Sequence, residues 1–166
     1  MPNFFKSIFD SDEDINIEEK NEEVGYTNNN EMLSDLFYRN VPVYEKWRFV
    51  CRGGGFEQEI TSERDKELAL KVVTNGMCAK SDIVHLTVEN DFSCGIAFTG
   101  DSVCVGGSLG RYNISYNDIH VAEDTPYGLV ITKNNGHEIR LEAVNNETIV
   151  FLYGFSRFLN IVKDLS

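Results

Sequence analysis

The fold is decided by residues 82–144, DIVHLTVENDFSCGIAFTGDSVCVGGSLGRYNISYNDIHVAEDTPYGLVITKNNGHEIRLEAV. Short runs of β-branched and aromatic residues alternate there with turn residues, a pattern typical of consecutive β-strands. The clearest turn is 134–136 (NNG), which separates two such runs and predicts a β-hairpin. We expect seven strands joined by short loops, as in a small antiparallel barrel or sandwich. The expected strands are 83–89, 95–99, 102–105, 111–116, 119–122, 127–133 and 137–144.

The residues after this segment predict one long amphipathic helix. Asn145 or Asn146 is a suitable residue to cap its N-terminus. Apolar residues then follow at helical spacing and form a wide stripe, whose members are Phe151, Phe155, Phe158, Leu159 and Val162. Because such a stripe has to pack on an apolar surface, we expect the helix to cover the open end of the barrel.

Seven short strands followed by one amphipathic helix resemble the pleckstrin-homology (PH) superfold. Residues 96–103 (IAFTGDSV) and 114–119 (ISYNDI) are similar to a pattern of bacterial PH-like domains, and the resemblance covers about residues 82–165. It implies a seven-stranded antiparallel PH-like barrel or sandwich capped by the C-terminal helix, with Ile114, Tyr116 and Ile119 in the core. It also implies protein docking, at an exposed sheet edge or in a groove beside the C-terminal helix.

The preceding residues, 31–80, predict an extension of helices and extended chain. Residues 31–38 carry a short helical stripe, 42–49 are expected to be extended, and the glycine triplet 53–55 is expected to break regular structure. A second helix is expected from a cap at Thr61 or Ser62 to about Thr74. The whole chain is thus expected to be α+β. Its expected units are an acidic, flexible arm (1–30), this helical and extended N-terminal extension (31–80) and the PH-like domain (82–166).

Charge separates the first unit from the others. The 166 residues carry 15 Lys and Arg against 27 Asp and Glu, a net charge of −12, and residues 1–30 hold half of it with eight acids and two lysines. An arm of this composition either aids solubility or docks on a basic partner. An acidic protein repels phosphate, which argues against nucleic acid and anionic membranes as partners. The expected loop 89–93 (ENDFS) has no Lys or Arg, whereas phosphoinositide-binding PH domains carry a basic loop there.

Little in the sequence points to catalysis or to a cofactor. The four cysteines form no CxxC pair and the three histidines are scattered, so we expect no metal site and no cofactor. The glycine clusters 53–55 and 106–110 lack the spacing of phosphate-binding loops, and we interpret them as flexible hairpin or loop segments. No segment has the features of a signal peptide or a membrane span, so we expect a cytoplasmic protein.

Aromatic and basic residues gather between positions 38 and 52. Tyr44, Trp47, Arg48 and Arg52 are the candidate partner-binding residues, because aromatic and arginine side chains recur in interface hot spots. Core packing of the same aromatic residues is the competing interpretation.

The expected function is that of a non-enzymatic cytoplasmic protein-interaction module with a protein partner. One alternative is an acidic inhibitor or immunity-type protein that covers a basic site on its partner. The other is a small hydrolase with a Cys–His pair, for which Cys94 or Cys104 with His85 or His120 are the candidates.

Overall fold

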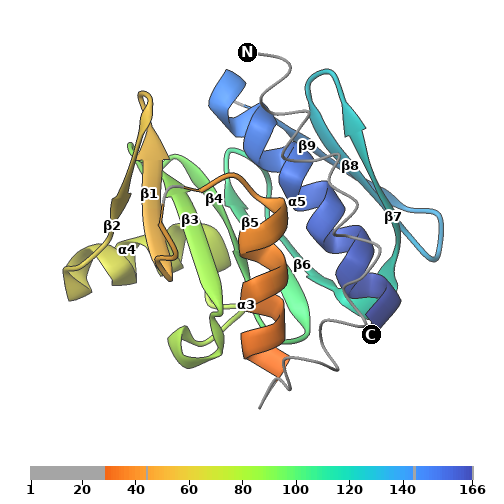
Figure 1. Ribbon diagram of the computed structural model, residues 1–166, viewed down its shortest axis with the longest axis horizontal. Coiled ribbons are helices and arrows are strands. Elements are labelled where there is room, and N and C mark those ends of the chain that lie inside the picture. The colour runs from red at the N-terminus through yellow and green to blue at the C-terminus, as the bar shows by residue number, and fades with distance from the viewer. Residues whose placement is uncertain (1–28, 44, 144, 166) are drawn as a thin grey trace.

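The computed structural model describes residues 29–43, 45–143 and 145–165, which form an α+β protein with helices and two β-sheets (Figure 1). All but the last two residues of the expected arm lie outside the described residues. The helices are α3 (Asn29–Asn40), α4 (Glu63–Thr74) and α5 (Asn146–Leu165), and short 3-10 turns are η2 (Lys80–Asp82) and η3 (Tyr116–Asp118). The strands are β1 (Phe49–Gly53), β2 (Phe56–Glu59), β3 (His85–Glu89), β4 (Cys94–Phe98), β5 (Ser102–Gly107), β6 (Tyr112–Ser115), β7 (Ile119–Thr125), β8 (Gly128–Lys133) and β9 (Glu138–Glu142).

The expected seven strands are all present, as β3 to β9, but the expected barrel is wrong. The strands form two open sheets in the orders β2-β1-β3-β4-β5-β6 and β7-β8-β9. Two further strands, β1 and β2, extend the first sheet, and β1 runs parallel to β3, so the sheet is not antiparallel throughout. This sheet therefore crosses the boundary that the sequence predicts near residue 81.

The glycine triplet explains why β1 and β2 escape sequence-based prediction. Gly54 and Gly55 have positive φ angles of 62° and 82° and make the tight turn of a β1–β2 hairpin. Glycine adopts this backbone conformation readily, so the triplet connects two strands here and does not end regular structure. The β2 sequence, FEQE, also lacks the apolar alternation of a buried strand.

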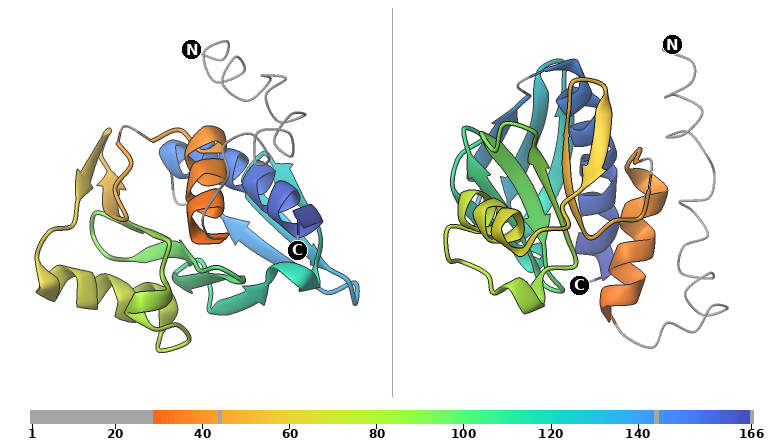
Figure 2. Two further views of the ribbon diagram at one scale, coloured as in Figure 1. Left: turned by 60° about the horizontal axis from the view of Figure 1, so that its bottom comes forward. Right: turned by 90° about the vertical axis from the view of Figure 1, so that its left-hand side faces the viewer.

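Helix α4 covers the outer face of the six-stranded sheet, opposite to α3 and α5 (Figure 2). The strands carry small residues beneath it, at Gly95, Ala97, Cys104 and Gly106. A Cβ atom at Gly106 would lie 2.1 Å from the backbone oxygen of Val72, so glycine is required for this close approach. Gly106 therefore belongs to a packed strand and not to a flexible loop. The expected N-cap of α4 is confirmed at Ser62, whose hydroxyl accepts the backbone N–H of Asp65 (3.1 Å).

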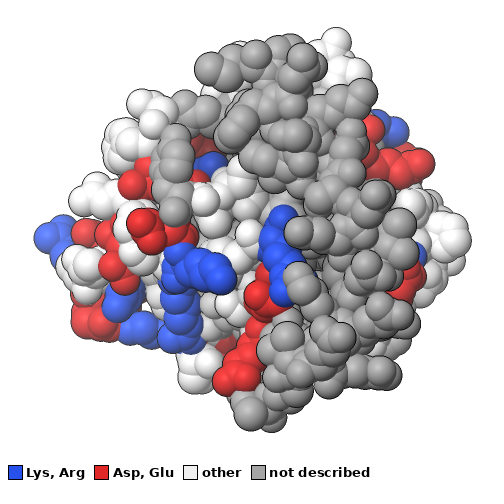
Figure 3. All heavy atoms as spheres, in the orientation of Figure 1, with Lys and Arg blue, Asp and Glu red and all other residues white. Residues whose placement is uncertain are grey.

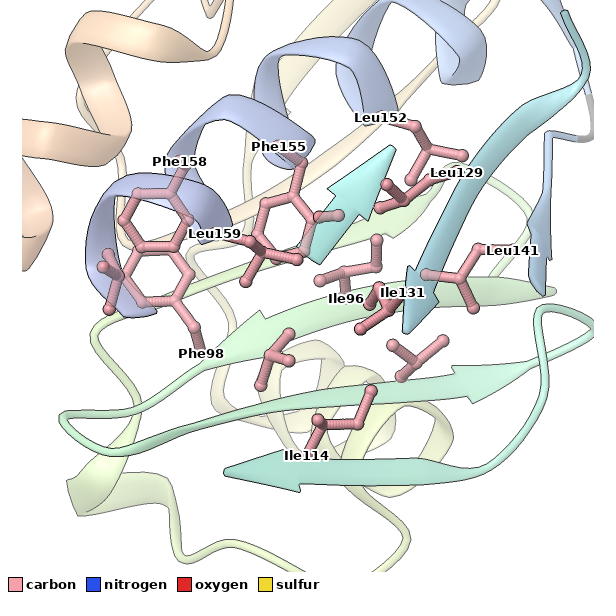
Figure 4. Packing of buried hydrophobic residues seen from close by; sticks show 14 of the residues in the cluster. Ile96, Phe98, Ile114, Leu129, Ile131, Leu141, Leu152, Phe155, Phe158 and Leu159 are labelled. Carbon is pink, nitrogen blue, oxygen red and sulfur yellow. The ribbon is translucent and has the colours of Figure 1, made fainter. Parts of the chain in front are cut away.

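Helix α5 buries its apolar stripe between the two open sheets and does not cover the end of a barrel. Its phenylalanines 155 and 158 face Ile96 and Phe98 of the larger sheet and lie near Leu129 and Ile131 of the smaller one (Figure 4). Asn145 is the N-cap, because its side-chain oxygen accepts the backbone N–H of Thr148 (2.9 Å). The stripe residues are all buried, and so are Ile114, Tyr116 and Ile119, which confirms the predicted core positions.

Candidate functional site

A surface groove of about 560 Å³ lies beside helix α3. One wall is α3 itself, with Glu31 and Asp35, and the opposite wall carries Lys46 and Arg48. The aromatic ring in the lining belongs to Tyr38, and the remaining lining residues are Asn30, Ser34, Ser81, Ile83 and Val84. Figure 3 shows Lys and Arg side chains gathered on this face between α3 and the lower ends of β1 and β2, with acidic side chains next to them.

Hydrogen bonds fix the basic wall, although residues 45–48 precede strand β1 and form no regular element. The Tyr38 hydroxyl donates to the backbone oxygen of Trp47 (2.7 Å). The Arg48 guanidinium donates through Nε to the backbone oxygen of Ile83 (2.7 Å) and through Nη2 to that of Lys80 (2.9 Å). The segment is therefore tied to α3 on one side and to the chain before β3 on the other.

A buried histidine supports this arrangement from the interior. His85 Nδ1 lies 3.1 Å from the Tyr38 hydroxyl, and Nε2 lies 2.6 Å from the hydroxyl of Thr87. Because the Trp47 carbonyl can only accept, the Tyr38 proton points to it, so Nδ1–H donates to Tyr38 and Nε2 accepts from Thr87. The ring also packs against Phe37, with centroids 4.3 Å apart. One tautomer of a neutral imidazole thus satisfies the whole chain of hydrogen bonds.

Burial keeps both ionisable members of this network neutral. Desolvation lowers the pKa of His85 to about 3, and the nearby positive charge of Arg52 acts in the same direction. Burial, with a smaller contribution from the Glu57 charge, raises the pKa of Tyr38 to about 12. The support of the basic wall therefore keeps its protonation state across the physiological pH range.

The structure places one of the four candidate partner-binding residues, Arg48, in the lining of the groove. Trp47 stands between Lys46 and Arg48 in the sequence and is partly exposed, but it does not line the groove. Arg52 is elsewhere: its side chain is only 12% exposed, lies 3.0 Å from the Glu57 carboxylate and stacks over the ring of Phe151 at 4.8 Å. Tyr44 lies outside the described residues. The surface interpretation therefore fits Arg48, Trp47 is intermediate between the two interpretations, and Arg52 belongs to the interior.

Sequence reasoning missed most of the remaining groove. Lys46 and Tyr38 stand in the aromatic and basic stretch, and that composition was the available signal. The wall formed by residues 81–84 has no such signal, because it reaches the groove only through the parallel pairing of β1 with β3. Glu31 and Asp35 also gave no signal in the sequence, because acidic residues at such helix positions are usually solvated.

A second, larger hollow of about 820 Å³ adjoins the groove and shares Asn30 and Ser81 with it. Three carboxylates line it, from Asp82, Asp101 and Asp118, and its described lining includes no Lys or Arg. We call it the acidic hollow. Within the described part of the chain, no group of three or more His, Cys, Asp or Glu side chains is arranged to hold a metal ion.

The hydrogen-bond partners of His85 are hydroxyl groups and not thiols. Both ring nitrogens of His85 have hydroxyl partners, and the thiol of Cys104 faces the side-chain oxygen of Asn113 at 3.7 Å. Burial raises the pKa of Cys94 and of Cys104, which lowers their thiolate fraction at neutral pH. These cysteines therefore lack the activation that a catalytic thiol needs.

Side chains of α5, the C-terminal helix, bond to the backbone of strand β7 along one edge of the smaller sheet. The side chain of Asn160 on α5 donates to the backbone oxygen of Ala122 in β7 (2.8 Å) and accepts its backbone N–H (2.9 Å). The Tyr153 hydroxyl donates to the backbone oxygen of Thr125 (3.0 Å). These side chains occupy hydrogen-bonding positions that an added strand would need at this edge of β7. The groove beside α3 is therefore the better docking site.

No family model matches this chain, and no curated protein or solved structure shows a significant match to it. Among the described residues, none of the helices combines the length and the apolar character required to cross a bilayer. The case for a function therefore depends on the geometry and charge of the groove.

Proposed function

We propose that the protein is a non-enzymatic cytoplasmic interaction module with a PH-like fold, and that it binds a partner protein through the groove beside α3. The observation that carries this proposal is the fixed basic wall. Lys46 and Arg48 face the groove, and among the described residues neither has a carboxylate within ion-pair distance. A partner segment that bears a carboxylate would supply the missing counter-charge.

The PH-like part of the proposal is supported by the division of the strands. The four strands β3 to β6 are consecutive antiparallel neighbours in one sheet, β7 to β9 form the other, and α5 packs between the two. This is the order of elements that the resemblance implies. In this proposal the β1–β2 hairpin and α3 are additions, and it is these additions that build the groove.

The groove offers both charge and apolar surface to a partner. The Lys46 ammonium lies 6.0 Å from the centre of the Tyr38 ring, and Trp47, the next residue in the chain, is partly exposed. Aromatic rings beside cations bury apolar area and attract carboxylates, which is a common composition for interface hot spots. Because Arg48 and the Trp47 backbone are already hydrogen-bonded in place, a partner would lose little free energy in ordering this part of the wall.

Charge reversal at Lys46 tests the proposal. The full chain is used to capture proteins from an extract of its own cells, as wild type, as Lys46→Glu and as the matched control Lys71→Glu. Lys71 is exposed on α4, on the opposite side of the sheet. We expect a partner retained by the wild type and by Lys71→Glu to be lost with Lys46→Glu. Equal retention by both variants would refute the groove as the binding site.

The acidic hollow favours a second candidate function, an acidic inhibitor that covers a basic site on its partner. Asp82 and Asp118 are exposed in that hollow, and electrostatic steering would speed capture of a basic partner. For this candidate, the double substitution Asp82→Asn and Asp118→Asn should slow association, and the association rate should fall steeply as salt rises. A partner whose association is insensitive to both changes excludes this candidate.

A further inference from the structure

The first 28 residues join the folded part of the chain at the rim of the groove. They hold eight acidic residues and two lysines, and they are continuous with Asn29, the first residue of α3. The next residue, Asn30, lines both the groove and the acidic hollow. The most acidic stretch of the chain is thus covalently attached next to the basic wall.

The distribution of charge along the chain matches this placement. Residues 39–80 hold eight basic and six acidic residues, whereas residues 81–166 hold five basic and eleven acidic ones. The groove's basic wall comes from the first of these regions, and the acidic hollow has aspartates from the second. Repulsion from the hollow and from Glu31 and Asp35 on α3, together with attraction to Lys46 and Arg48, would direct an acidic segment to the Lys46–Arg48 wall of the groove.

We propose that the acidic run within residues 10–23 folds back onto the Lys46–Arg48 wall of its own chain and competes there with the partner. The chain is long enough for this contact. Residues 30 to 38 of α3 rise about 12 Å along the helix axis. The five residues 24–28 span up to about 17 Å when extended, so Glu22 and Glu23 can reach the wall. The inference rests on the proposed function in that both place the binding site in the same groove.

Zero-length cross-linking of the full chain tests the contact. A water-soluble carbodiimide joins a lysine ammonium to a carboxylate only when the two touch, and digestion with mass spectrometry locates the new amide. We expect cross-links from residues 10–23 to Lys46 and few or none to the control Lys71, and we expect them to disappear in 1 M salt, at a Debye length of about 3 Å. Equal yields at both lysines, or no product at Lys46, would overturn the inference.

An equal mixture of unlabelled and ¹⁵N-labelled chains identifies the occupant of the groove. Contact within one chain gives cross-linked peptides with a single isotope composition, as the inference requires. Mixed-isotope products would instead show the segment of a second copy on the wall and would also overturn it.

The two proposals fail in distinguishable ways. If Lys46→Glu loses the partner while the wild type gives no cross-link at Lys46, the fold-back is wrong and the groove remains the binding site. If the cross-link forms at Lys46 while Lys46→Glu keeps the partner, the proposed function is wrong and the fold-back remains.

As a second readout, the combined change of Glu18, Glu19, Glu22 and Glu23 to Gln should strengthen partner binding about tenfold, because it weakens the segment that competes with the partner at the wall. Unchanged affinity would argue against competition.

Discussion

The inner face of the six-stranded sheet has two halves of different composition. Strands β4 to β6 present apolar side chains such as Ile96 and Phe98 to the phenylalanines of α5. Strands β1 and β3 present Arg52, His85 and Thr87 on the same face, where hydrogen bonds and an ion pair hold them. The first half supplies hydrophobic stabilisation, and the second holds the wall of the groove in one conformation. Stability and binding should therefore respond to different substitutions.

The largest effect on stability is expected in the apolar half. Phe158 is fully buried and its ring packs 4.8 Å from that of Phe98. Phe158→Ala should lower the free energy of unfolding by about 3–5 kcal/mol, measured by urea denaturation, because it removes buried area and leaves a cavity. The control Phe56→Ala alters a ring that is 48% exposed and should change it by less than about 0.5 kcal/mol. Similar losses in the two variants would contradict this account of the core.

The polar half should show a smaller loss of stability together with a loss of binding. Tyr38→Phe removes the hydroxyl that joins Trp47 to His85 and should cost about 1–3 kcal/mol, because the buried His85 and the part-buried Trp47 carbonyl lose their partner. It should also weaken partner capture, since residues 46–48 lose their tie to α3. Phe158→Ala, assayed where it remains folded, should leave capture unchanged. A Tyr38→Phe protein that binds normally would show that the wall does not depend on this bond.

The buried histidine predicts a pH dependence of stability that arises in the polar half. Its pKa is lowered to about 3 in the folded protein, against 6.5 for an ordinary histidine, so the unfolded chain binds the proton more readily between these values. His85 therefore contributes stability that is present above pH 6.5 and is lost as pH falls towards 3. The slope is at most about 1.4 kcal/mol per pH unit. His85→Gln should lack this slope, so the difference in the free energy of unfolding between wild type and variant should vary with pH. A difference that stays constant between pH 3 and 6.5 would disprove the assignment.

The smallest effect on stability is expected in the groove itself. Lys46 is exposed, so Lys46→Ala should change the free energy of unfolding by less than about 0.5 kcal/mol. The same variant should weaken partner capture, which would separate binding from stability at a single position. If Lys46→Ala unfolds at a markedly lower denaturant concentration than the wild type, Lys46 is a structural residue, and the predicted separation of binding from stability at this position is wrong.

The comparison also shows what can be predicted from the sequence. Local signals were enough to predict β3 to β9, the caps at Ser62 and Asn145 and the apolar stripe of α5, because each feature depends on residues close together in the sequence. The pairing of β1 with β3 is not local, since it joins residues 37 positions apart, such as Val50 and Thr87. The groove depends on that pairing, so its far wall could not be predicted.

The candidate residues illustrate the same limit. Arg48 is exposed and Trp47 partly exposed, while Arg52 turns inward on the next strand and pairs with Glu57. Composition alone does not distinguish these arginines, because the difference lies in what packs across from each. For Arg48 the neighbours are backbone carbonyls at the surface, and for Arg52 they are a carboxylate and the ring of Phe151.

Site-specific photo-cross-linking in living cells tests the groove most directly. A photoreactive amino acid replaces Ser34, which lines the groove on α3, and in a control protein it replaces Glu67, which is exposed on α4 across the sheet. Our account predicts a discrete adduct with one partner protein from position 34 and no such adduct from position 67. An adduct from position 67 alone, or the same adduct from both positions, would contradict binding through the groove.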